Sequence, residues 1–241
     1  MQEALSPKRN IQPDGLQWGV PNMPKVEYRK HFKDLYLPPA EPRLVDVPPA
    51  TFVAVHGHGD PNTGADFQAA MQAIYTISFG IKMLPKTGVT PAGYYEYTVF
   101  PPEGLWDVEP SLERAHQNGG ALDKSALRWS IMIRQPNFVT PELLEDVRAM
   151  AARKKDSARV DLCRLETITD GLSVQMMHIG PYDAEPASFA RMDEFCCKHG
   201  YVRRGHLHRE IYLSDPRRVA PDRLRTVIRY AVTRSEQGAA K

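Results

Sequence analysis

The sequence predicts an α+β fold built from two similar modules, each consisting of a strand, a helix and two further strands. Short β-branched and aromatic runs alternate with amphipathic helical segments. The same order of elements occurs twice, about 120 residues apart. The strand-to-helix junctions are also alike, since HGHGDP (residues 56–61) resembles HIGP (residues 178–181). We interpret this pattern as an internal duplication; the alternative is a chance similarity of two α+β segments.

Residues 1–50 are predicted to form a proline-rich arm. Proline lacks an amide hydrogen and interrupts helices, so we expect an extended segment with one short helix at residues 28–35. The arm is too short and too often broken by proline to be a helix-turn-helix module. Its prolines are Pro7, Pro13, Pro21, Pro24, Pro38, Pro39, Pro42, Pro48 and Pro49.

Module 1 is predicted at about residues 51–136. TFVAVHGHG (51–59) is typical of a buried strand, and residues 65–83 have the apolar spacing of an amphipathic helix that ends near Pro85. YYEYTVF (94–100) predicts a strand closed by Pro101 and Pro102, and SALRWSIMI (125–133) predicts another. Thr140 and Pro141 then begin a linking helix at 141–155 with a capping hydroxyl and a preset proline.

Module 2 is predicted at about residues 160–235. VDLCRLET (160–167) and LSVQMMHIGP (172–181) are expected to form a hairpin through Asp170 and Gly171. A helix follows and ends at His199 and Gly200, because glycine readily takes the left-handed conformation that terminates helices. HLHREIYL (206–213) and LRTVIRYAV (224–232) predict a second hairpin.

Composition excludes several classes of protein. A net charge of +2 on 241 residues leaves no basic footprint for nucleic acid or an anionic membrane. No apolar run is long enough to span a bilayer, and the first residues lack a signal-peptide pattern. The three cysteines show no CxxC spacing and are typical of thiols in a reducing compartment. We therefore expect a cytoplasmic protein, monomeric or homodimeric.

The strand at residues 206–213 has two unlike faces. Leu207, Ile211 and Leu213 alternate with a row of His206, His208, Glu210 and Tyr212, and only Arg209 interrupts the apolar face. We expect the apolar face to pack and the polar face to carry a function. The alternative is that Glu210 is an exposed strand residue paired with a neighbouring arginine.

Four segments, in order along residues 35–232, identify a family resemblance. They are LYLPPAEPRLVDVPPATFVAVHGHGDP, DFQAAMQAIYTISFGIKM, YTVFPPEGLW and HREIYLSDPRRVAPDRLRTVIR. Together they resemble the GyrI-like small-molecule-binding proteins, and more narrowly the stand-alone subgroup with a proline-rich arm. The resemblance implies two pseudo-symmetric modules whose strands form a ligand groove, as in the ligand domains of multidrug regulators.

The resemblance also implies a class of ligand. The groove of this family takes aromatic, often cationic molecules and has a glutamate among its walls. Related domains act as sensors in transcriptional regulators or as toxin and gyrase inhibitors, and some stand-alone members hydrolyse electrophilic cyclopropane natural products. This sequence departs from the subgroup at Pro102, where leucine is usual, and at Asp107, where a second tryptophan is usual.

Glu210 is the main candidate of the site. A partly desolvated carboxylate can attract a cationic ring system or act as a general base on water. Tyr182 could hydrogen-bond a ligand carbonyl; its alternative role is to pack the start of a helix. Glu103 and Trp106 would supply a charge and a stacking surface in module 1, or else be a turn acid and a core tryptophan.

The remaining candidates would line an apolar cleft or the polar face of the strand. Residues of this kind are also common in a plain core. The predicted ligand-binding residues besides Glu103 and Trp106 are Tyr75, Phe79, Trp129, Met132, Met176, His178, His208 and Tyr212.

No cofactor or metal is predicted. The pairs His56/His58 and His206/His208 have the spacing of metal ligands, but a zinc site would need a third ligand such as Glu210 and nothing else in the sequence supports one. No phosphate loop, nucleophile elbow or dinucleotide fingerprint is present.

The sequence thus favours binding of an aromatic xenobiotic. The alternative is a metal-independent, detoxifying hydrolase. A transcriptional sensor would need a partner that contacts DNA.

Overall fold

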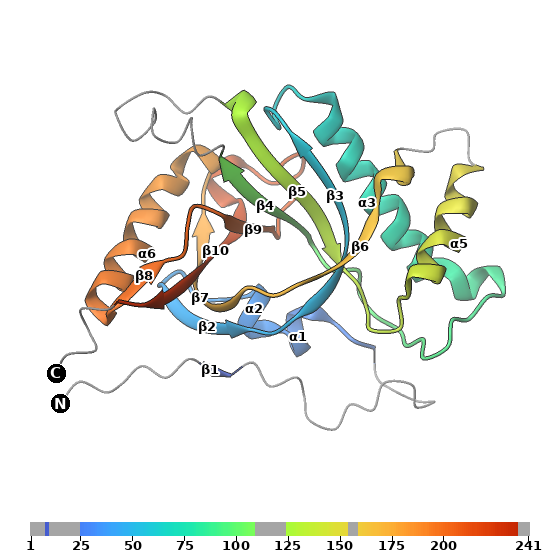
Figure 1. The fold of residues 1–241 in the computed structure, drawn as a ribbon, viewed down its shortest axis with the longest axis horizontal. Helices are drawn as coiled ribbons and strands as arrows, with labels where there is room; N and C mark the ends of the chain where they lie inside the picture. Colours follow the sequence, from blue (N-terminus) through green and yellow to red (C-terminus); the bar gives the residue numbers. More distant parts are fainter. Residues whose placement is uncertain (1–7, 10–24, 109–123, 154–158, 236–241) are drawn as a thin grey trace. The chain divides into compact units, whose positions relative to one another are not determined.

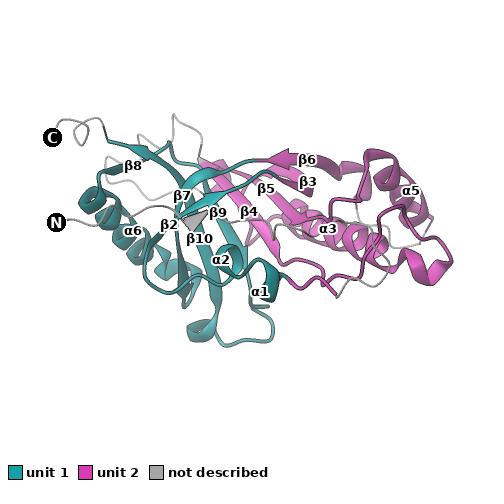
Figure 2. Cartoon of the chain, turned by 90° about the horizontal axis from the view of Figure 1, so that it is seen from below, with its two compact units in different colours: residues 1–14, 28–49, 169–241 teal, residues 15–27, 50–168 magenta. Residues whose placement is uncertain are grey.

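The fold is described from a computed structural model covering residues 8–9, 25–108, 124–153 and 159–235 (Figure 1). The chain divides into two compact units (Figure 2). Unit 1 comprises residues 1–14, 28–49 and 169–241, and unit 2 comprises residues 15–27 and 50–168. Each unit combines a mostly antiparallel sheet with helices, so the predicted α+β class is confirmed.

Unit 2 has a four-stranded antiparallel sheet in the order β4-β5-β3-β6. Helix α3 packs on β3 and β5, and α5 packs on α3. The strands are β3 (Ala50–His58), β4 (Pro102–Val108), β5 (Leu127–Arg134) and β6 (Arg164–Ile168). The helices are α3 (Ala65–Met83) and α5 (Pro141–Ala152), with short 3₁₀ turns at Leu84–Thr87, Lys124–Ala126 and Val160–Leu162.

Unit 1 has a sheet in the order β1-β2-β7-β10-β9, with β8 beside the end of β10. Helix α6 packs on β7 and β8. The strands are β1 (Lys8–Arg9), β2 (Arg43–Val47), β7 (Gly171–Ile179), β8 (Tyr201–Arg203), β9 (His208–Tyr212) and β10 (Arg225–Arg234). The helices are α1 (Tyr28–His31), α2 (Lys33–Tyr36) and α6 (Glu185–His199), with 3₁₀ turns η4 (Tyr182–Ala184) and η5 (Pro221–Arg223).

Several predicted elements are confirmed with their signals. Helix α3 has the predicted bounds. Helix α5 begins as expected, since the Leu143 amide donates to Thr140 Oγ1 at 3.2 Å. Helix α6 ends at Gly200, which has the left-handed φ of 70°. The hairpin of β9 and β10 is also present. The arm holds two short helices and strand β2 where one short helix was expected.

The predicted hairpin through Asp170 and Gly171 is wrong. Strand β6 pairs with β3 of unit 2, whereas β7 pairs with β2 and β10 of unit 1. Strand β6, predicted as the first arm of the hairpin, thus pairs with the first strand of module 1, and β7 pairs with a strand of the proline-rich arm. The chain crosses between the units at residues 49–50 and again at residues 168–169. Such non-local pairing leaves no trace in the period of a single segment.

The strand predicted at residues 94–100 is also wrong. This segment has only an isolated bridge between Val26 and Tyr97, and the strand is β4, which begins at Pro102. Proline is tolerated as the first residue of a strand, where its missing N–H is not needed by the ladder. Glu103 and Trp106, predicted to follow the end of the strand, therefore lie within β4 and alternate between its faces.

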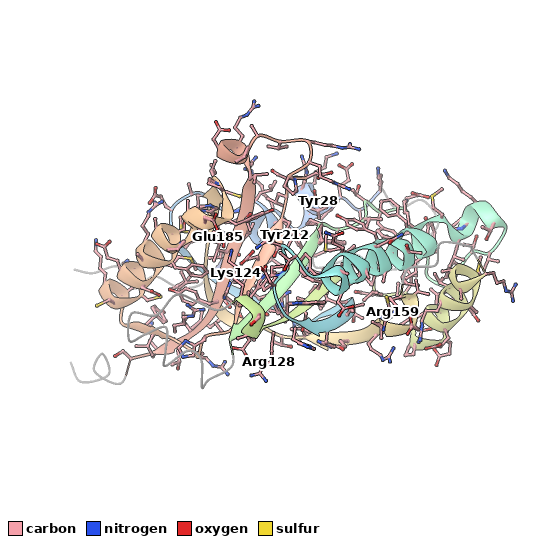
Figure 3. All side chains as sticks on the ribbon, turned by 90° about the horizontal axis from the view of Figure 1, so that it is seen from above. Tyr28, Lys124, Arg128, Arg159, Glu185 and Tyr212 are labelled. Carbon is pink, nitrogen blue, oxygen red and sulfur yellow. The ribbon has the colours of Figure 1, made fainter. Side chains whose placement is uncertain are left out.

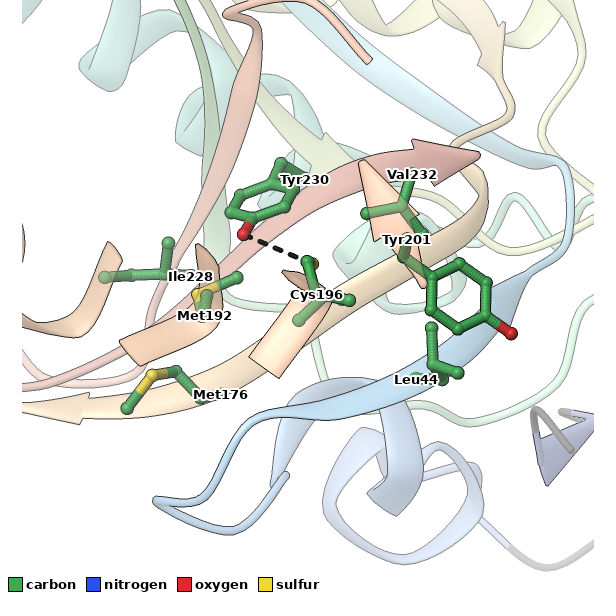
Figure 4. Close-up of a cluster of buried hydrophobic side chains, with 9 residues drawn as sticks. Leu44, Met176, Met192, Cys196, Tyr201, Ile228, Tyr230 and Val232 are labelled. Atoms are coloured by element: carbon green, nitrogen blue, oxygen red, sulfur yellow. Dashed lines mark hydrogen bonds between the residues drawn. The ribbon is translucent and has the colours of Figure 1, made fainter. Parts of the chain in front are cut away.

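The core of unit 1 lies between α6 and the sheet (Figure 4). Met176, Ile228 and Tyr230 from the strands meet Met192 and Cys196 from the helix. The Tyr230 hydroxyl is held by Asp193 Oδ1 at 2.6 Å and lies 3.6 Å from Cys196 Sγ. This core fixes the register of α6 over the sheet, and the first residue of α6 is therefore placed firmly as well.

Candidate functional site

Glu210 lies on the face of the unit 1 sheet that α6 covers. Ile228 of β10 is the register partner of both Met176 in β7 and Glu210 in β9. Side chains of directly paired residues leave a sheet on the same face. Because Met176 and Ile228 pack against Met192 of α6 in the core cluster, Glu210 shares that face.

The apolar face of β9 packs as predicted, since Ile211 is buried, and the alternative of an exposed Glu210 is wrong. Glu210 is only 8% exposed, and Arg209 and Ile211 on the opposite face are buried as well. Leu207 is exposed and precedes the strand. Both faces of the strand are covered at its centre, and the carboxyl of Glu210 is a buried group that needs partners.

One partner of Glu210 is a second carboxyl, that of Glu185. Glu185 is the first residue of α6, is buried, and shares a hydrogen bond with Glu210. Its other oxygen, Oε1, has no hydrogen-bond donor among the residues that the structure describes. Burial, the charge of Glu210 and this hydrogen bond raise the pKa of Glu185 from its ordinary value to about 9. The shift favours the protonated, uncharged form of this carboxyl.

Aromatic groups and an imidazole surround the pair. His208 Nε2 donates to Glu210 Oε1 at 3.1 Å, and the ring of His208 meets the Phe189 ring edge-on at 5.0 Å. The rings of Tyr182 and Tyr212 are in edge-on contact at 6.0 Å. Figure 3 labels Tyr212 and Glu185, which come from β9 and α6. The sequence-predicted residues of module 2 are thus brought together with Glu185.

The hydroxyl of Tyr182 is a hydrogen-bond donor over the whole neutral range. Burial first, and then the negative charges of Glu210, Glu185 and Asp215, raise the pKa of Tyr182 to about 12. The side chain is 37% exposed, so the hydroxyl is neither a core group nor fully in solvent. A half-exposed phenol beside a buried acid pair can donate to a ligand oxygen.

His178 holds the turn that carries Tyr182 and Glu185. Its Nε2 lies 3.1 Å from the Pro181 carbonyl oxygen and must donate to it, since a carbonyl only accepts. Nδ1 then accepts from the Ser188 hydroxyl at 2.9 Å. Gly180 permits the turn with a φ of 138°, which side chains rarely adopt. The imidazole of His178 is buried and fully engaged, so it positions the site.

The opposite face of the same strands carries a different acid. Asp170 accepts from Arg209 at 2.6 and 2.8 Å and from Arg229 at 3.3 Å. Burial alone would raise the pKa of Asp170, but the two guanidinium groups lower it below its ordinary value. Arg229 also donates to Gln175 and to the Leu35 carbonyl of α2. This cluster ties the arm to the sheet and has its charge compensated within the protein.

In unit 2 the two main candidates of module 1 point to opposite faces. Trp106 is the register partner of Trp129, and both rings contact Phe67 of α3 at 5.7 and 5.3 Å. Glu103 instead pairs with Met132, which packs with Phe52 away from α3. The predicted pocket of a carboxylate next to Trp106 is therefore wrong, because residues separated by three along a strand leave on different sides.

Trp106 and Trp129 belong to the core of unit 2, as the alternative prediction held. Trp106 and Trp129 are buried, and the Trp129 ring fills the space over Gly57, where a Cβ would lie 2.2 Å from the indole. Glu103 and Met132 are buried too. Tyr75 and Phe79 differ, since they stack at 6.2 Å on α3 and are 36% and 50% exposed.

Two polar features of unit 2 bear on earlier predictions. His56 is engaged through both ring nitrogens, with Ser130 Oγ at 2.7 Å and Glu166 Oε1 at 2.6 Å. Asp107 is the register partner of Arg128, whose guanidinium lies 3.7 Å from the Asp107 carboxylate.

Within the described ranges no group of three or more His, Cys, Asp or Glu is placed to hold a metal ion. Nor does that part of the chain contain a helix of the length and hydropathy that crossing a bilayer requires.

Glu185 is the functional candidate to which sequence reasoning assigned no role, although it was noted beside Tyr182 after the turn at residues 178–181. It follows the turn at residues 178–181 and begins a helix, a position where an acidic residue is ordinary. The unusual property is its burial against Glu210, which lies 25 positions away along the sequence. The one signal that could have pointed to it is the repeated strand-to-helix junction, which placed Tyr182 next to the same turn.

Comparisons with known proteins agree with this fold. A model of the GyrI-like small molecule binding domain matches residues 130–232. Two crystal structures of a hydrolase from Listeria innocua are 33% identical, with TM-scores of 0.78 and 0.79. An uncharacterized conserved protein from Listeria innocua is 36% identical, with a TM-score of 0.79. Each alignment covers 87% of this chain and 100% of the other chain. No curated protein matches the sequence.

These matches extend over both units and include the strands and the helix that hold Glu210, Glu185 and Tyr182. Fold and sequence agree on the same assignment. The chain belongs to the family of GyrI-like small-molecule-binding proteins.

Proposed function

We propose that the protein binds aromatic small molecules, cationic ones in particular, beside Glu210 on the α6-covered face of unit 1. One observation carries this proposal. The buried carboxyl of Glu210 has the Glu185 carboxyl and the His208 imidazole as partners. The aromatic side chains of Tyr182 and Tyr212 belong to the same cluster. A protein interior that needs this acid for stability alone would match it with a guanidinium, as it does for Asp170.

The chemistry of the surrounding rings favours the same ligand class. Tyrosine rings attract a cation through their negative faces, and each such contact contributes about 0.5–2 kcal/mol, more when water is excluded. Tyr182 and Tyr212 are within ring contact of one another, and Tyr182 interacts electrostatically with Glu210. A delocalised cation can bring its charge to the carboxylate while its rings contact the tyrosines, which a small inorganic cation does not do.

The test is a binding titration with N-methylacridinium, an aromatic cation, and acridine, its neutral analogue. We expect the wild type to bind the cation at least about tenfold more tightly, which corresponds to 1.4 kcal/mol. Glu210→Gln should abolish this preference. Glu194→Gln, an exposed change on the same helix, is the matched control. Equal affinity of wild type and Glu210→Gln for the cation would overturn the proposal.

A second candidate function is hydrolysis of a strained electrophile such as a conjugated cyclopropane. Two observations favour it. The Tyr182 hydroxyl remains a donor at neutral pH beside a buried acid pair. In addition, the chain is similar along its length to a hydrolase of Listeria innocua at 33% identity.

The proposed step needs no metal or organic cofactor. Glu210 removes a proton from water while the water oxygen forms a bond to a cyclopropane carbon. The C–C bond breaks, and its electron pair moves to the conjugated carbonyl oxygen. Tyr182 donates a hydrogen bond to that oxygen as it becomes negative, and a proton from solvent completes the product. General-base and oxyanion contributions of this kind each lower the barrier by several kcal/mol.

Product formation separates the two functions. Wild type, Glu210→Gln and Tyr182→Phe are incubated with a cyclopropane-containing electrophile, and the ring-opened product is followed by chromatography. The hydrolase hypothesis predicts turnover by the wild type and a rate of product formation about 100-fold or more lower in each variant. If wild type binds the compound but leaves it intact, binding alone is the function.

A further inference from the structure

The hydrogen bond between the carboxyls of Glu185 and Glu210 in unit 1 requires a proton on one of them. Glu185 and Glu210 are 7% and 8% exposed and share a hydrogen bond. Two ionised carboxylates have only acceptor oxygens and cannot form such a bond. A proton on one of them provides the donor and removes the repulsion between two buried negative charges.

The surroundings of the pair also favour one retained proton. Asp183 from η4 and Asp215 from the loop after β9 add negative charge near Glu185 and Tyr182. Asp215 is itself paired with Arg217 and Arg218. His208 hydrogen-bonds Glu210 through Nε2, and the raised pKa of Tyr182 keeps its hydroxyl uncharged. The cationic ends of Arg209 and Arg229 are engaged by Asp170 on the other face of the sheet.

We propose that Glu185 and Glu210 share a single proton and that binding of an aromatic cation expels this proton. The inference rests on the proposed binding function at Glu210 and adds its regulation: cation binding is an exchange of one positive charge for another. A neutral ligand of the same shape leaves the proton in place. The site therefore distinguishes charged from neutral aromatic ligands by their pH dependence as well as by affinity.

The energetics of the exchange are within ordinary limits. A nearby opposite charge lowers the pKa of a carboxyl by about 1–3 units. Starting from the raised pKa of Glu185, this is enough to release much of the proton just above neutral pH. By linkage, proton release on binding requires that the affinity for the cation rise with pH, by up to about tenfold per pH unit. The affinity for a neutral ligand stays flat over the same range.

Isothermal titration calorimetry measures the released proton directly. The full chain is titrated with N-methylacridinium, and separately with acridine, in two buffers of the same slightly alkaline pH and different ionisation enthalpies. The difference in observed enthalpy between the buffers gives the number of protons exchanged. We expect at least about half a proton released per cation and close to none per acridine bound.

Glu185→Gln is the decisive variant, because glutamine keeps the shape and donor of the protonated acid and has no proton to lose. It should still bind the cation, release close to none of the proton and lose the rise of affinity with pH. Glu194→Gln should behave as wild type. Binding of the cation by wild type without proton release would overturn the inference while leaving the binding function intact. Failure to bind either ligand would instead contradict the proposed function.

A measurement on the ligand-free wild type tests the shared proton even if the Glu185→Gln variant fails to fold. The ¹³C resonances of the side-chain carboxyls of Glu185 and Glu210, followed by NMR through a pH titration of the wild type, should show one proton on the pair at neutral pH. Ionisation of both carboxyls at neutral pH would overturn the shared proton regardless of any variant.

Discussion

Two acids on opposite faces of the unit 1 sheet, Asp170 and Glu210, have opposite kinds of partner. Asp170 accepts hydrogen bonds from Arg209 and Arg229, so its charge is compensated by neighbouring guanidinium groups. Glu210, adjacent to Arg209 in the sequence, is partnered by Glu185 and His208 on the face that α6 covers. Strand alternation alone separates the two environments, which lie one residue apart on β9.

Under the proposed function, the difference separates an acid that stabilises the fold, Asp170, from an acid that is available to a ligand, Glu210. The Asp170 cluster reaches the arm through the Leu35 carbonyl and holds elements together. The Glu210 pair connects to a half-exposed tyrosine and keeps a negative charge that lacks an arginine or lysine partner among the interactions described above. Perturbed carboxyls with this arrangement are typical of functional sites.

Removal of the acid in the compensated cluster is expected to have the largest effect on stability. Asp170→Ala leaves two buried guanidinium groups without their carboxylate and should lower the free energy of unfolding by about 3–5 kcal/mol. Urea denaturation measures this, with the exposed Asp222→Ala as the control. A loss below about 1 kcal/mol would show that the cluster is not structural.

Removal of the charge at Glu210 should have a large effect on ligand affinity and a small effect on stability. Glu210→Gln should weaken binding of N-methylacridinium by at least about tenfold, or 1.4 kcal/mol, while stability falls little. The reason is that the glutamine side chain keeps the size of glutamate and still accepts a hydrogen bond from His208. Affinity and unfolding are measured on the same samples. If the variant instead unfolds as readily as Asp170→Ala, the two faces do not differ in role.

The pH dependence of stability should have opposite signs for the two acids. The folded-state pKa of Glu185 lies above its unfolded value, so folding takes up a proton between the two values. Its stabilising contribution is complete at acid pH and is lost as pH rises toward about 9. The pKa of Asp170 is lowered, so its contribution is present at neutral pH and lost in acid.

Thermal unfolding as a function of pH tests this contrast. Glu185→Gln should be more stable than wild type at alkaline pH by about 1–2 kcal/mol, with the difference shrinking as the pH falls toward 5. Asp170→Ala should differ most from wild type at neutral pH. A constant difference between Glu185→Gln and wild type at every pH would contradict the assigned protonation.

The smallest expected effect concerns the hydroxyl of Tyr182. Tyr182→Phe keeps the ring and should change the affinity for N-methylacridinium by less than about threefold, whereas Tyr182→Ala removes a contact worth about 0.5–2 kcal/mol. Titrations of both variants measure the ring and the hydroxyl separately. An equal loss of affinity in both would mean that the hydroxyl, rather than the ring, binds the cation.

Local signals in the sequence predicted much of the fold. The apolar spacing of residues 65–83 and the capping pattern at Thr140 depend only on nearby residues, and both helices are present. The hairpin of β9 and β10 follows from alternation and a polar loop. The pairing of β6 with β3 and of β7 with β2 was not predictable in this way, because it joins segments distant along the chain.

The site was predictable to the extent that it follows strand alternation. His208, Glu210 and Tyr212 share a face as expected, but which face α6 covers depends on packing. Glu103 and Trp106 were grouped wrongly because Pro102 was interpreted as the end of a strand that it begins. Glu185 was assigned no role because its burial results from the position of α6 over β9, which no pattern in residues 185–199 encodes.

Methionine methyl NMR tests the central claim, that the ligand binds on the α6-covered face beside Glu210. Met176 and Met192 lie in the core beneath this face, and Met177, the next residue of β7, points to the other face. On addition of N-methylacridinium we predict shifts of the Met176 and Met192 methyl resonances, no shift of Met177, and loss of these shifts in Glu210→Gln. A shift confined to Met177, or identical shifts in wild type and Glu210→Gln, would contradict the account.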